Sequence, residues 1–390
     1  MAMVKRCLCR SEEDFRGLLR TTNIHLFSYK EIRRATNNFD HGNKLGRGGF
    51  GTVYKVLVLL LPLGACSVKL GKIEQWRRVY MQGTFGDGTA FAAKVLSCES
   101  EQGIKEFLTE IESISEAKHA NLVSLLGCCV QKQNRILVYE YAENNSLDHA
   151  LKALGSASGA TILPWSVRSG ICMGTAKGLS YLHEEHEPNI VHRDIKASNV
   201  LLGRGYSPKI GDFGLAKLFP DNVTHVTTRV VGTTGYLAPE YVVHGQLTKK
   251  ADVYSFGVLV LEIISGRRVS ETIRSDTFLV RQVAWLLYEQ GKPLDMVDAR
   301  VKDYPEAEVL RYIKVGLACT QAAPSGRPTM QQVVKMLSRP AALRVLEMNF
   351  ADHDCSAAIT RPGMSLSPLS SMATTSMNSA SATYSQIVPR

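Results

Sequence analysis

Two short stretches of the sequence carry side chains that could do chemistry together. Residues 192–199 read His-Arg-Asp-Ile-Lys-Ala-Ser-Asn, and Asp212 follows thirteen residues after that asparagine. The first stretch holds the carboxylate of Asp194, the ammonium of Lys196 and the carboxamide of Asn199. Phosphoryl transfer from a magnesium-bound nucleotide needs a carboxylate for the hydroxyl proton, a cation beside the moving phosphate and hard oxygen ligands for the metal. The two stretches therefore predict phosphoryl-transfer chemistry, provided that other residues position a nucleotide.

A glycine-rich stretch at residues 45–53 could cover the phosphates of that nucleotide. Gly46, Gly48 and Gly51 allow a tight hairpin whose backbone amides approach phosphate oxygens without a Cβ in the way. Dinucleotide-binding turns share this glycine spacing, but there the chain continues as a helix. Because the residues from Val53 onward indicate a strand, we expect a β-hairpin over the phosphates.

A lysine and a glutamate further along the chain could hold the phosphates from the other side. Lys94 follows a Phe-Ala-Ala run that is typical of a strand. Residues 103–117 show apolar side chains at helical spacing, and Glu110 lies at the edge of that stripe. A carboxylate there can reach Lys94, whereas we expect Glu106 and Glu112 on the exposed face. This pair predicts a lysine held over the α- and β-phosphates.

The composition limits the other classes of function. A chain of 390 residues with 45% hydrophobic residues can form a full core. The net charge of +10 is scattered without a block of cations, so we expect no nucleic-acid binding. Nine cysteines without a C-x-x-C pair fit a reducing compartment. Because the longest apolar run, residues 56–66, is shorter than the roughly twenty residues of a membrane span, we expect no transmembrane segment.

The order of the predicted elements indicates an α+β enzyme with two lobes. Ser28 and Glu31 form a capping box for a helix that should end near Asn37. Residues 1–26 are predicted to be a flexible lead-in, and residues 341–390, rich in Ser and Thr, a disordered tail. Between them we expect strands at 122–130 and 135–141, and helices at 167–183, 252–265, 309–320 and 329–337.

The whole ordered set of motifs resembles the eukaryotic protein kinases over residues 27–340. Within that family it resembles plant receptor-like cytoplasmic kinases, on the stretches at 27–39, 232–241 and 325–330. The resemblance implies the two-lobed protein-kinase fold, with a small antiparallel-sheet N-lobe at about 27–138 and a mainly helical C-lobe at about 142–340. It also implies ATP with Mg²⁺ or Mn²⁺, protein substrates with Ser or Thr acceptors, an upstream receptor kinase, and a cytoplasmic location.

Matched position by position, the resemblance assigns roles to the catalytic residues. Asp194 would be the catalytic base, and Lys196 would contact the γ-phosphate and indicate a Ser or Thr acceptor. Asn199 and Asp212 would hold the metal. Lys94 and Glu110 would form the ion pair of the nucleotide site. The other nucleotide-binding residues would be Leu45, Gly46, Gly48, Gly51, Val53, Ala92, the gatekeeper Tyr139, Glu140, Tyr141 and Leu201.

The resemblance also assigns residues that brace the substrate-binding segment. Glu240 and Arg327 would form a buried ion pair. Asp252 would hydrogen-bond the backbone of the catalytic loop. Thr233 would line the pocket for the residue that follows the acceptor.

Arg193, directly before Asp194, resembles the arginine of kinases whose activation loop is ordered by phosphorylation. A phosphothreonine carries about two negative charges and could pair with this cation. Thr224, Thr227 and Thr228 are the candidates, and we favour Thr227 or Thr228. The alternative is that these threonines are ordinary polar residues of a loop.

One segment departs from the family pattern. Forty residues separate Val53 from Lys94, far more than a strand hairpin needs. The pattern would join Lys55 directly to Gly83, so residues 56–82 are in excess and are expected to interrupt the strand itself. A slip of one residue there would turn each side chain to the opposite face and endanger the contact of Lys94 with its glutamate. The interruption supports a second hypothesis, a catalytically impaired scaffold.

Two origins of residues 56–82 stay open. Every valine codon begins with GU and one glutamine codon is CAG, so a retained intron of eighty-one nucleotides, or a gene-model error, could encode Val56 at its start and Gln82 at its end. The other origin is an evolved insert, either a regulatory segment with a basic end or an apolar docking segment.

The N-terminal stretch also has two interpretations. Cys7 and Cys9 lie beside Lys5, Arg6 and Arg10, a setting in which thiols can be acylated at an anionic membrane surface. That reading predicts peripheral association with the plasma membrane. The simpler interpretation is two ordinary thiols in a flexible tail.

Overall fold

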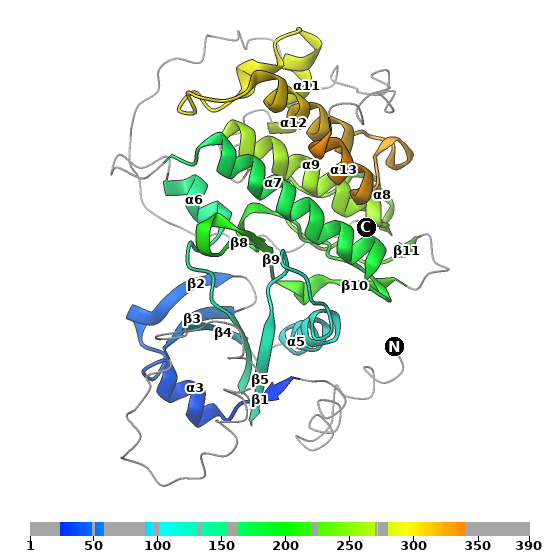
Figure 1. The fold of residues 1–390 in the computed structure, drawn as a ribbon. Coiled ribbons are helices and arrows are strands. Elements are labelled where there is room, and N and C mark those ends of the chain that lie inside the picture. Colours follow the sequence, from blue (N-terminus) through cyan, green and yellow to red (C-terminus); the bar gives the residue numbers. More distant parts are fainter. Residues whose placement is uncertain are drawn as a thin grey trace. The chain divides into compact units, whose positions relative to one another are not determined.

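A computed structural model shows the fold (Figure 1). It describes residues 24–48, 51–57, 90–96, 101–131, 134–153, 162–219, 225–269, 271 and 280–339. The chain divides into two units, Met1–Asp352 and His353–Arg390, and all the described residues belong to the first. Several predictions concern residues outside this part: the lead-in up to residue 23 with Cys7 and Cys9, residues 58–82, Thr224 and the tail.

The first part of the described chain forms one six-stranded sheet in the order β1-β5-β6-β4-β3-β2. Its strands are β1 (His25–Leu26), β2 (Lys44–Gly48), β3 (Gly51–Leu57), β4 (Ala90–Leu96), β5 (Leu125–Gln131) and β6 (Asn134–Glu140). Neighbouring strands are antiparallel, except that β1 lies parallel to β5. The predicted small antiparallel sheet is therefore confirmed, and it carries an additional parallel edge strand.

The position of the excess segment differs from the prediction. Strand β3 does not stop at Lys55, because Val56 and Leu57 continue it and pair with Phe91 and Ala90 of β4. The register is unbroken from Gly51 to Leu57. The expected interruption within the strand was therefore wrong: the excess chain leaves from the end of β3 and lies in the connection to β4. Insertions are best tolerated in such connections, because no ladder hydrogen bond is lost.

A segment before the glycine-rich hairpin covers one face of the sheet. Helix α3 (Tyr29–Ala35) begins with the predicted capping box, in which Ser28 Oγ accepts from the backbone of Glu31 at 3.2 Å. Ile32 of this helix is buried in a cluster with sheet side chains of β4, β5 and β6. Gly127 on β5 lets β1 approach, since a Cβ there would clash with the backbone oxygen of His25.

Helix α5 (Glu101–Ile114) packs against strands β4 and β6 and against the turn at Phe213–Leu215. Its apolar stripe is buried as predicted, with Phe107, Ile111 and Ile114 at 3% exposure or less. One prediction about this helix was wrong. Glu106 is 2% exposed instead of lying on the solvent face. The start of the activation segment (residues 212–238) covers the side of α5 that the periodicity left open.

The second part of the described chain is mainly helical (Figure 1). Its helices are α6 (Leu147–Ala153), α7 (Trp165–Ser180), α8 (Pro239–His244), α9 (Lys249–Ser265), α11 (Val280–Glu289), α12 (Glu306–Cys319) and α13 (Met330–Ser338). Short strand pairs join β7 (Asn189–Val191) to β10 (Lys217–Phe219), β8 (Val200–Leu202) to β9 (Pro208–Ile210), and β11 (Val226–Thr227) to β12 (Gln246–Leu247). The four predicted helices of this part are present, with ends that differ by up to three residues.

Helix α9 is the centre of this part, because nearly all of its residues are buried. It packs against α7, α11 and α12. Although α9 is strongly apolar, no helix among the described residues is long and apolar enough to span a membrane.

A buried carboxyl group on α9 predicts a pH dependence of stability. Glu262 accepts hydrogen bonds from the Tyr236 hydroxyl and, at 2.9 Å, from the Val269 amide, and burial raises its pKa to about 7. The folded state thus binds this proton more tightly, so stability falls as pH rises from about 4.5 to about 7. We expect Glu262→Gln to stabilise the protein by up to about 3 kcal/mol at pH 8 and by little at pH 5.

Urea denaturation at both pH values measures this difference. Glu143→Gln, an exposed site, is the matched control and should change neither value. Equal effects of Glu262→Gln at pH 5 and pH 8 would contradict the assignment.

Candidate active site

The carboxylate of Asp194 is the centre of a hydrogen-bonded group of side chains. It lies in the loop after β7 and is 4% exposed. Its Oδ1 accepts from Thr233 Oγ1 at 2.6 Å, and its Oδ2 accepts from Lys196 Nζ at 2.7 Å and Asn199 Nδ2 at 3.1 Å. These donors hold the carboxylate in one orientation.

Asp252 of α9 fixes the backbone of the same loop. Its carboxylate accepts from the amides of His192 at 2.7 Å and Arg193 at 2.8 Å, and from His183 Nε2 at 2.9 Å. Arg193 has a φ of 70°, a backbone conformation that residues with side chains seldom adopt. The contacts of Asp252 hold the loop in that strained conformation, which aims Asp194 into the site.

Lys94, Glu110 and Asp212 form a second charged group. Lys94 Nζ lies 2.8 Å from Glu110 Oε2 and 2.6 Å from Asp212 Oδ1. The expected contact of Lys94 with Glu110 is thus present, although residues 58–89 separate the two neighbouring strands. Burial would lower the pKa of Lys94, but the charges of Glu110 and Asp212 raise it above its ordinary value. Burial likewise acts to raise the pKa of Asp212, and the nearby Lys94 ammonium outweighs it and lowers that pKa.

Asn199 and Asp212 have oxygen atoms that fit a divalent cation. The amide nitrogen of Asn199 is used by Asp194, at 2.9 Å to the backbone oxygen, which leaves its carbonyl oxygen available. One oxygen of Asp212 faces Lys94, and its side chain is 28% exposed. Mg²⁺ in nucleotide sites is held by one or two such groups together with phosphate oxygens. Among the described residues, no cluster of three acidic, His or Cys side chains offers a different metal site.

The expected nucleotide pocket is built from neighbouring strands. Gly46, Gly48 and Gly51 lie on β2 and β3, while residues 49–50 at the hairpin tip are outside the described part. Val53 pairs with Lys94, and Ala92 pairs with Tyr139 on the other side of β4. Four more residues expected in the pocket are half-buried. They are Leu45 on β2, Glu140 on β6, Tyr141 directly after β6, and Leu201 on β8.

The gatekeeper position is linked to the ion pair. Tyr139 is buried, and its hydroxyl donates to Oε1 of Glu110. The backbone amide of Phe213 donates to the same oxygen at 3.3 Å. Glu110 therefore connects α5 to β4, β6 and the turn after Asp212.

Thr233 belongs to the hydrogen-bonded group around Asp194. Its hydroxyl donates to Asp194 and accepts from Lys196 Nζ at 2.8 Å, and its place in a substrate pocket stays a prediction. Sequence reasoning missed this contact because thirty-nine residues separate Thr233 from Asp194. Only its place in the Gly-Thr-Thr-Gly stretch at 232–235 marked it for attention.

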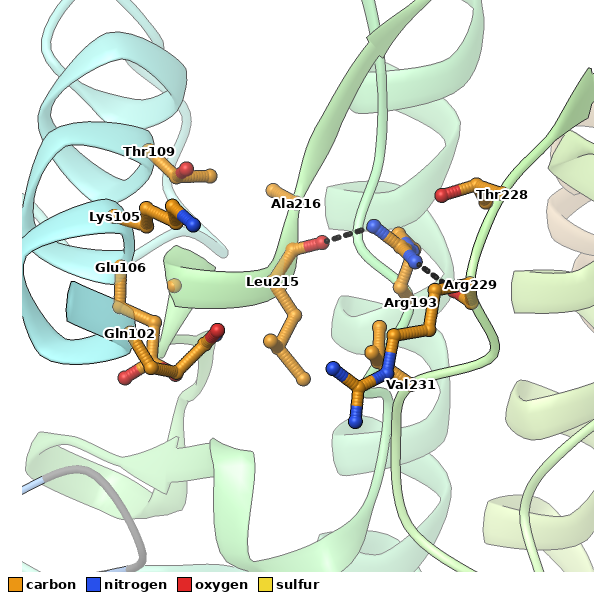
Figure 2. A pocket seen from close by; sticks show the side chains of 11 residues that line it. Gln102, Lys105, Glu106, Thr109, Arg193, Leu215, Ala216, Thr228, Arg229 and Val231 are labelled. Atoms are coloured by element: carbon orange, nitrogen blue, oxygen red, sulfur yellow. Dashed lines mark hydrogen bonds between the residues drawn. The ribbon is translucent and has the colours of Figure 1, made fainter. Parts of the chain in front are cut away.

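Arg193 borders a pocket between α5 and the activation segment, shown in Figure 2. Its guanidinium donates to Tyr241 Oη at 2.7 Å and to the backbone oxygens of Arg229 at 3.0 Å and Leu215 at 3.4 Å. The pocket measures about 190 Å³, and Thr228 also lines it. Thr227, in contrast, is exposed on β11 and does not line the pocket.

Glu240 and Arg327 form the predicted buried ion pair. The guanidinium meets both carboxylate oxygens at 2.7 Å, and it also donates to three backbone oxygens. Glu240 lies on α8, directly after the activation segment, and Arg327 precedes α13. The pair therefore ties the end of that segment to the helical part.

Comparisons with known proteins match most of this chain. The protein kinase domain family matches residues 76–337, more than half of the chain. Cold-responsive protein kinase 1 of Arabidopsis thaliana is 51% identical over 318 residues, which are 81% of this chain and 75% of that protein. A probable leucine-rich repeat receptor-like serine/threonine-protein kinase of the same plant is 46% identical over 336 residues, 86% of this chain but 30% of that protein.

A further probable LRR receptor-like serine/threonine-protein kinase from Arabidopsis is 46% identical over 327 residues, 83% of this chain and 28% of that protein. The chain thus spans three quarters of the cold-responsive kinase and less than a third of the two receptor-like proteins. The chain belongs to the protein kinase domain family and, within it, to the plant receptor-like serine/threonine kinases.

Proposed function

We propose that this chain, with residues 56–82 present, is an active ATP- and Mg²⁺-dependent kinase that phosphorylates Ser and Thr in proteins of receptor-linked signalling. The observation that carries the proposal is the position of Lys94, which contacts Glu110 and Asp212 together. The hypothesis of an impaired scaffold rested on the excess segment, which could disrupt the nucleotide lobe and shift the strand register. The continuous pairing of β3 with β4 supports an intact register.

The side chains around Asp194 fit the chemistry of phosphoryl transfer to a hydroxyl. As the acceptor oxygen bonds to the γ-phosphorus, the bond to the β-phosphate oxygen breaks and ADP leaves. The carboxylate of Asp194 accepts the hydroxyl proton, and Thr233 and Lys196 keep it oriented. Lys196 also places its positive charge beside the transferring group, which carries negative charge.

Asn199 and Asp212 would hold Mg²⁺ or Mn²⁺, which neutralises charge on the phosphates when ATP is bound. Lys94 would contact the α- and β-phosphates. In the structure its ammonium is already oriented by two carboxylates.

Deleting residues 56–82 tests whether the excess segment impairs the enzyme. We expect the full chain and the shortened chain to autophosphorylate at comparable rates, because β3 and β4 of the full chain pair in one continuous register despite the excess residues. Incorporation of labelled phosphate from ATP measures this, and an Asp194→Asn version of each chain sets the background. If only the shortened chain incorporates phosphate, the impaired-scaffold hypothesis is right for this form.

We further propose that phosphorylation of Thr228 controls activity. Thr228 lines the pocket that holds Arg193 and Arg229, so its phosphate would meet two guanidinium groups. Of the two threonines favoured from the sequence, we therefore propose Thr228 and not Thr227 as the phosphorylated residue. The modifying enzyme is either a second copy of this kinase or an upstream receptor kinase.

Replacing the two threonines separates their roles. We expect Thr228→Ala to lower substrate phosphorylation by about tenfold or more, since charge-assisted hydrogen bonds to the phosphate are lost. Thr227→Ala, exposed beside it, is the matched control and should stay near the wild-type rate. A turnover of the double variant equal to wild type would reject control by either residue.

A further inference from the structure

The pocket in Figure 2 contains two buried polar atoms that have no hydrogen-bond partner among the described residues. One is Oε2 of Glu106 on α5, and the other is Nε of Arg193. Oε1 of Glu106 accepts from Gln102 Nε2 at 2.9 Å. Burial raises the pKa of Glu106 to about 7. A carboxylate that is 2% exposed and half-satisfied is costly, so this side chain requires a cation or a proton.

Only one cation that lines the pocket is available for Glu106. Lys105 already has an interaction of its own, and Arg193 donates to three oxygens. Arg229 lines the same pocket, and within the described part of the chain its guanidinium has no hydrogen bond or ion pair. Figure 2 shows Arg229 and Glu106 on opposite sides of the pocket, with Leu215 between them.

The backbone of Arg229 is held in place while its side chain is exposed. Its carbonyl oxygen accepts from Arg193 Nη2 and from Tyr241 Oη, both at 3.0 Å. The guanidinium can therefore change its side-chain rotamer while the backbone stays in place. Arginine suits this contact, because its planar guanidinium is always charged and carries several donors that match a carboxylate.

We propose that Glu106 is a positioning residue that binds the guanidinium of Arg229 when Thr228 carries no phosphate. Glu110 lies one helical turn after Glu106, so the pair connects the activation segment to the helix that orients Lys94. The second half of the inference rests on the proposed control by Thr228: a phosphate there draws Arg229 away, and Glu106 then takes a proton.

Trypsin cleavage after Arg229 measures the pair directly. In phosphatase-treated protein without ATP, we expect Glu106→Gln to speed cleavage at this bond by about fivefold, because the bound arginine is released. Glu112→Gln, an exposed glutamate on the same helix, is the matched control. Cleavage of Glu106→Gln at the rate of Glu112→Gln would overturn the proposal.

After autophosphorylation with ATP, the same comparison should show no difference between Glu106→Gln and wild type, because Arg229 then binds phosphate. If mass spectrometry finds no phosphate on Thr228, the proposed control fails, and the phosphatase-treated samples still decide the pair. A persistent fivefold difference with Thr228 phosphorylated would overturn the second half.

A thermal double-mutant cycle gives a readout that does not depend on cleavage. In phosphatase-treated protein, Arg229→Gln should lower the melting temperature when Glu106 is present and leave it unchanged in the Glu106→Gln background. Arg229→Lys, which keeps the charge, should restore part of the loss. Equal effects of Arg229→Gln in both backgrounds would show that the two side chains do not interact.

Discussion

Replacing Asp194 with asparagine should lower the rate of phosphate transfer by about 10²- to 10⁴-fold, the range typical for a lost general base. The amide keeps the shape of the carboxylate and can still accept from Lys196 or Asn199, so the loop should keep its conformation. An amide cannot accept the hydroxyl proton, however. We therefore expect the loss in kcat and little change in nucleotide binding.

Phosphorylation of a Ser/Thr peptide and binding of a fluorescent ATP analogue measure the two effects separately. Asp295→Asn, at an exposed site of the helical part, is the matched control and should match wild type in both. Two results would contradict the assignment: a rate for Asp194→Asn near wild type, or a loss confined to nucleotide binding.

Replacing Arg327 with methionine should destabilise the fold by about 3–5 kcal/mol, the usual cost of removing one partner of a buried ion pair. Its side chain is fully buried, and the substitution leaves the carboxylate of Glu240 and three backbone oxygens without their donor. Arg327→Lys should recover only part of this loss, because an ammonium cannot bind both carboxylate oxygens in the same way. Chemical denaturation measures the change.

The exposed Arg204→Met provides the control, and it should alter stability by less than about 0.5 kcal/mol. Adding Glu240→Gln to Arg327→Met should cost little more, because the buried charge that lost its partner is then removed as well. Fully additive losses would show that the two residues act independently.

The elements of this fold followed well from local patterns. The capping box of Ser28 and Glu31 and the apolar stripe of α5 each depend on residues a few positions apart. Helical spacing also selected Glu110 over Glu112 as the partner of Lys94. The same reasoning failed for Glu106, because the side chains that cover it come from the activation segment, more than a hundred residues later. The periodicity of apolar residues identifies the helix face that packs in the core. It does not show whether another segment also covers the polar face.

The length of the pairing between β3 and β4 could not be predicted from the sequence either. The residues around Lys55 predicted a broken strand, and the structure shows that Val56 and Leu57 fill the next two positions of the ladder. A strand accepts many apolar side chains at such positions, so the identity of the residues could not decide where pairing ends.

The sequence by itself determined the chemistry of this protein: which carboxylates, lysines and amides are available, and that they suit phosphoryl transfer from a nucleotide. Only the tertiary structure decided which of them meet. It brings Thr233 to Asp194, Thr228 rather than Thr227 to the pocket of Arg193, and Glu106 to the opposite side of that pocket. The physical reason is that each of these contacts joins segments brought together by packing of the core, while local spacing constrains only neighbours within a turn or a strand.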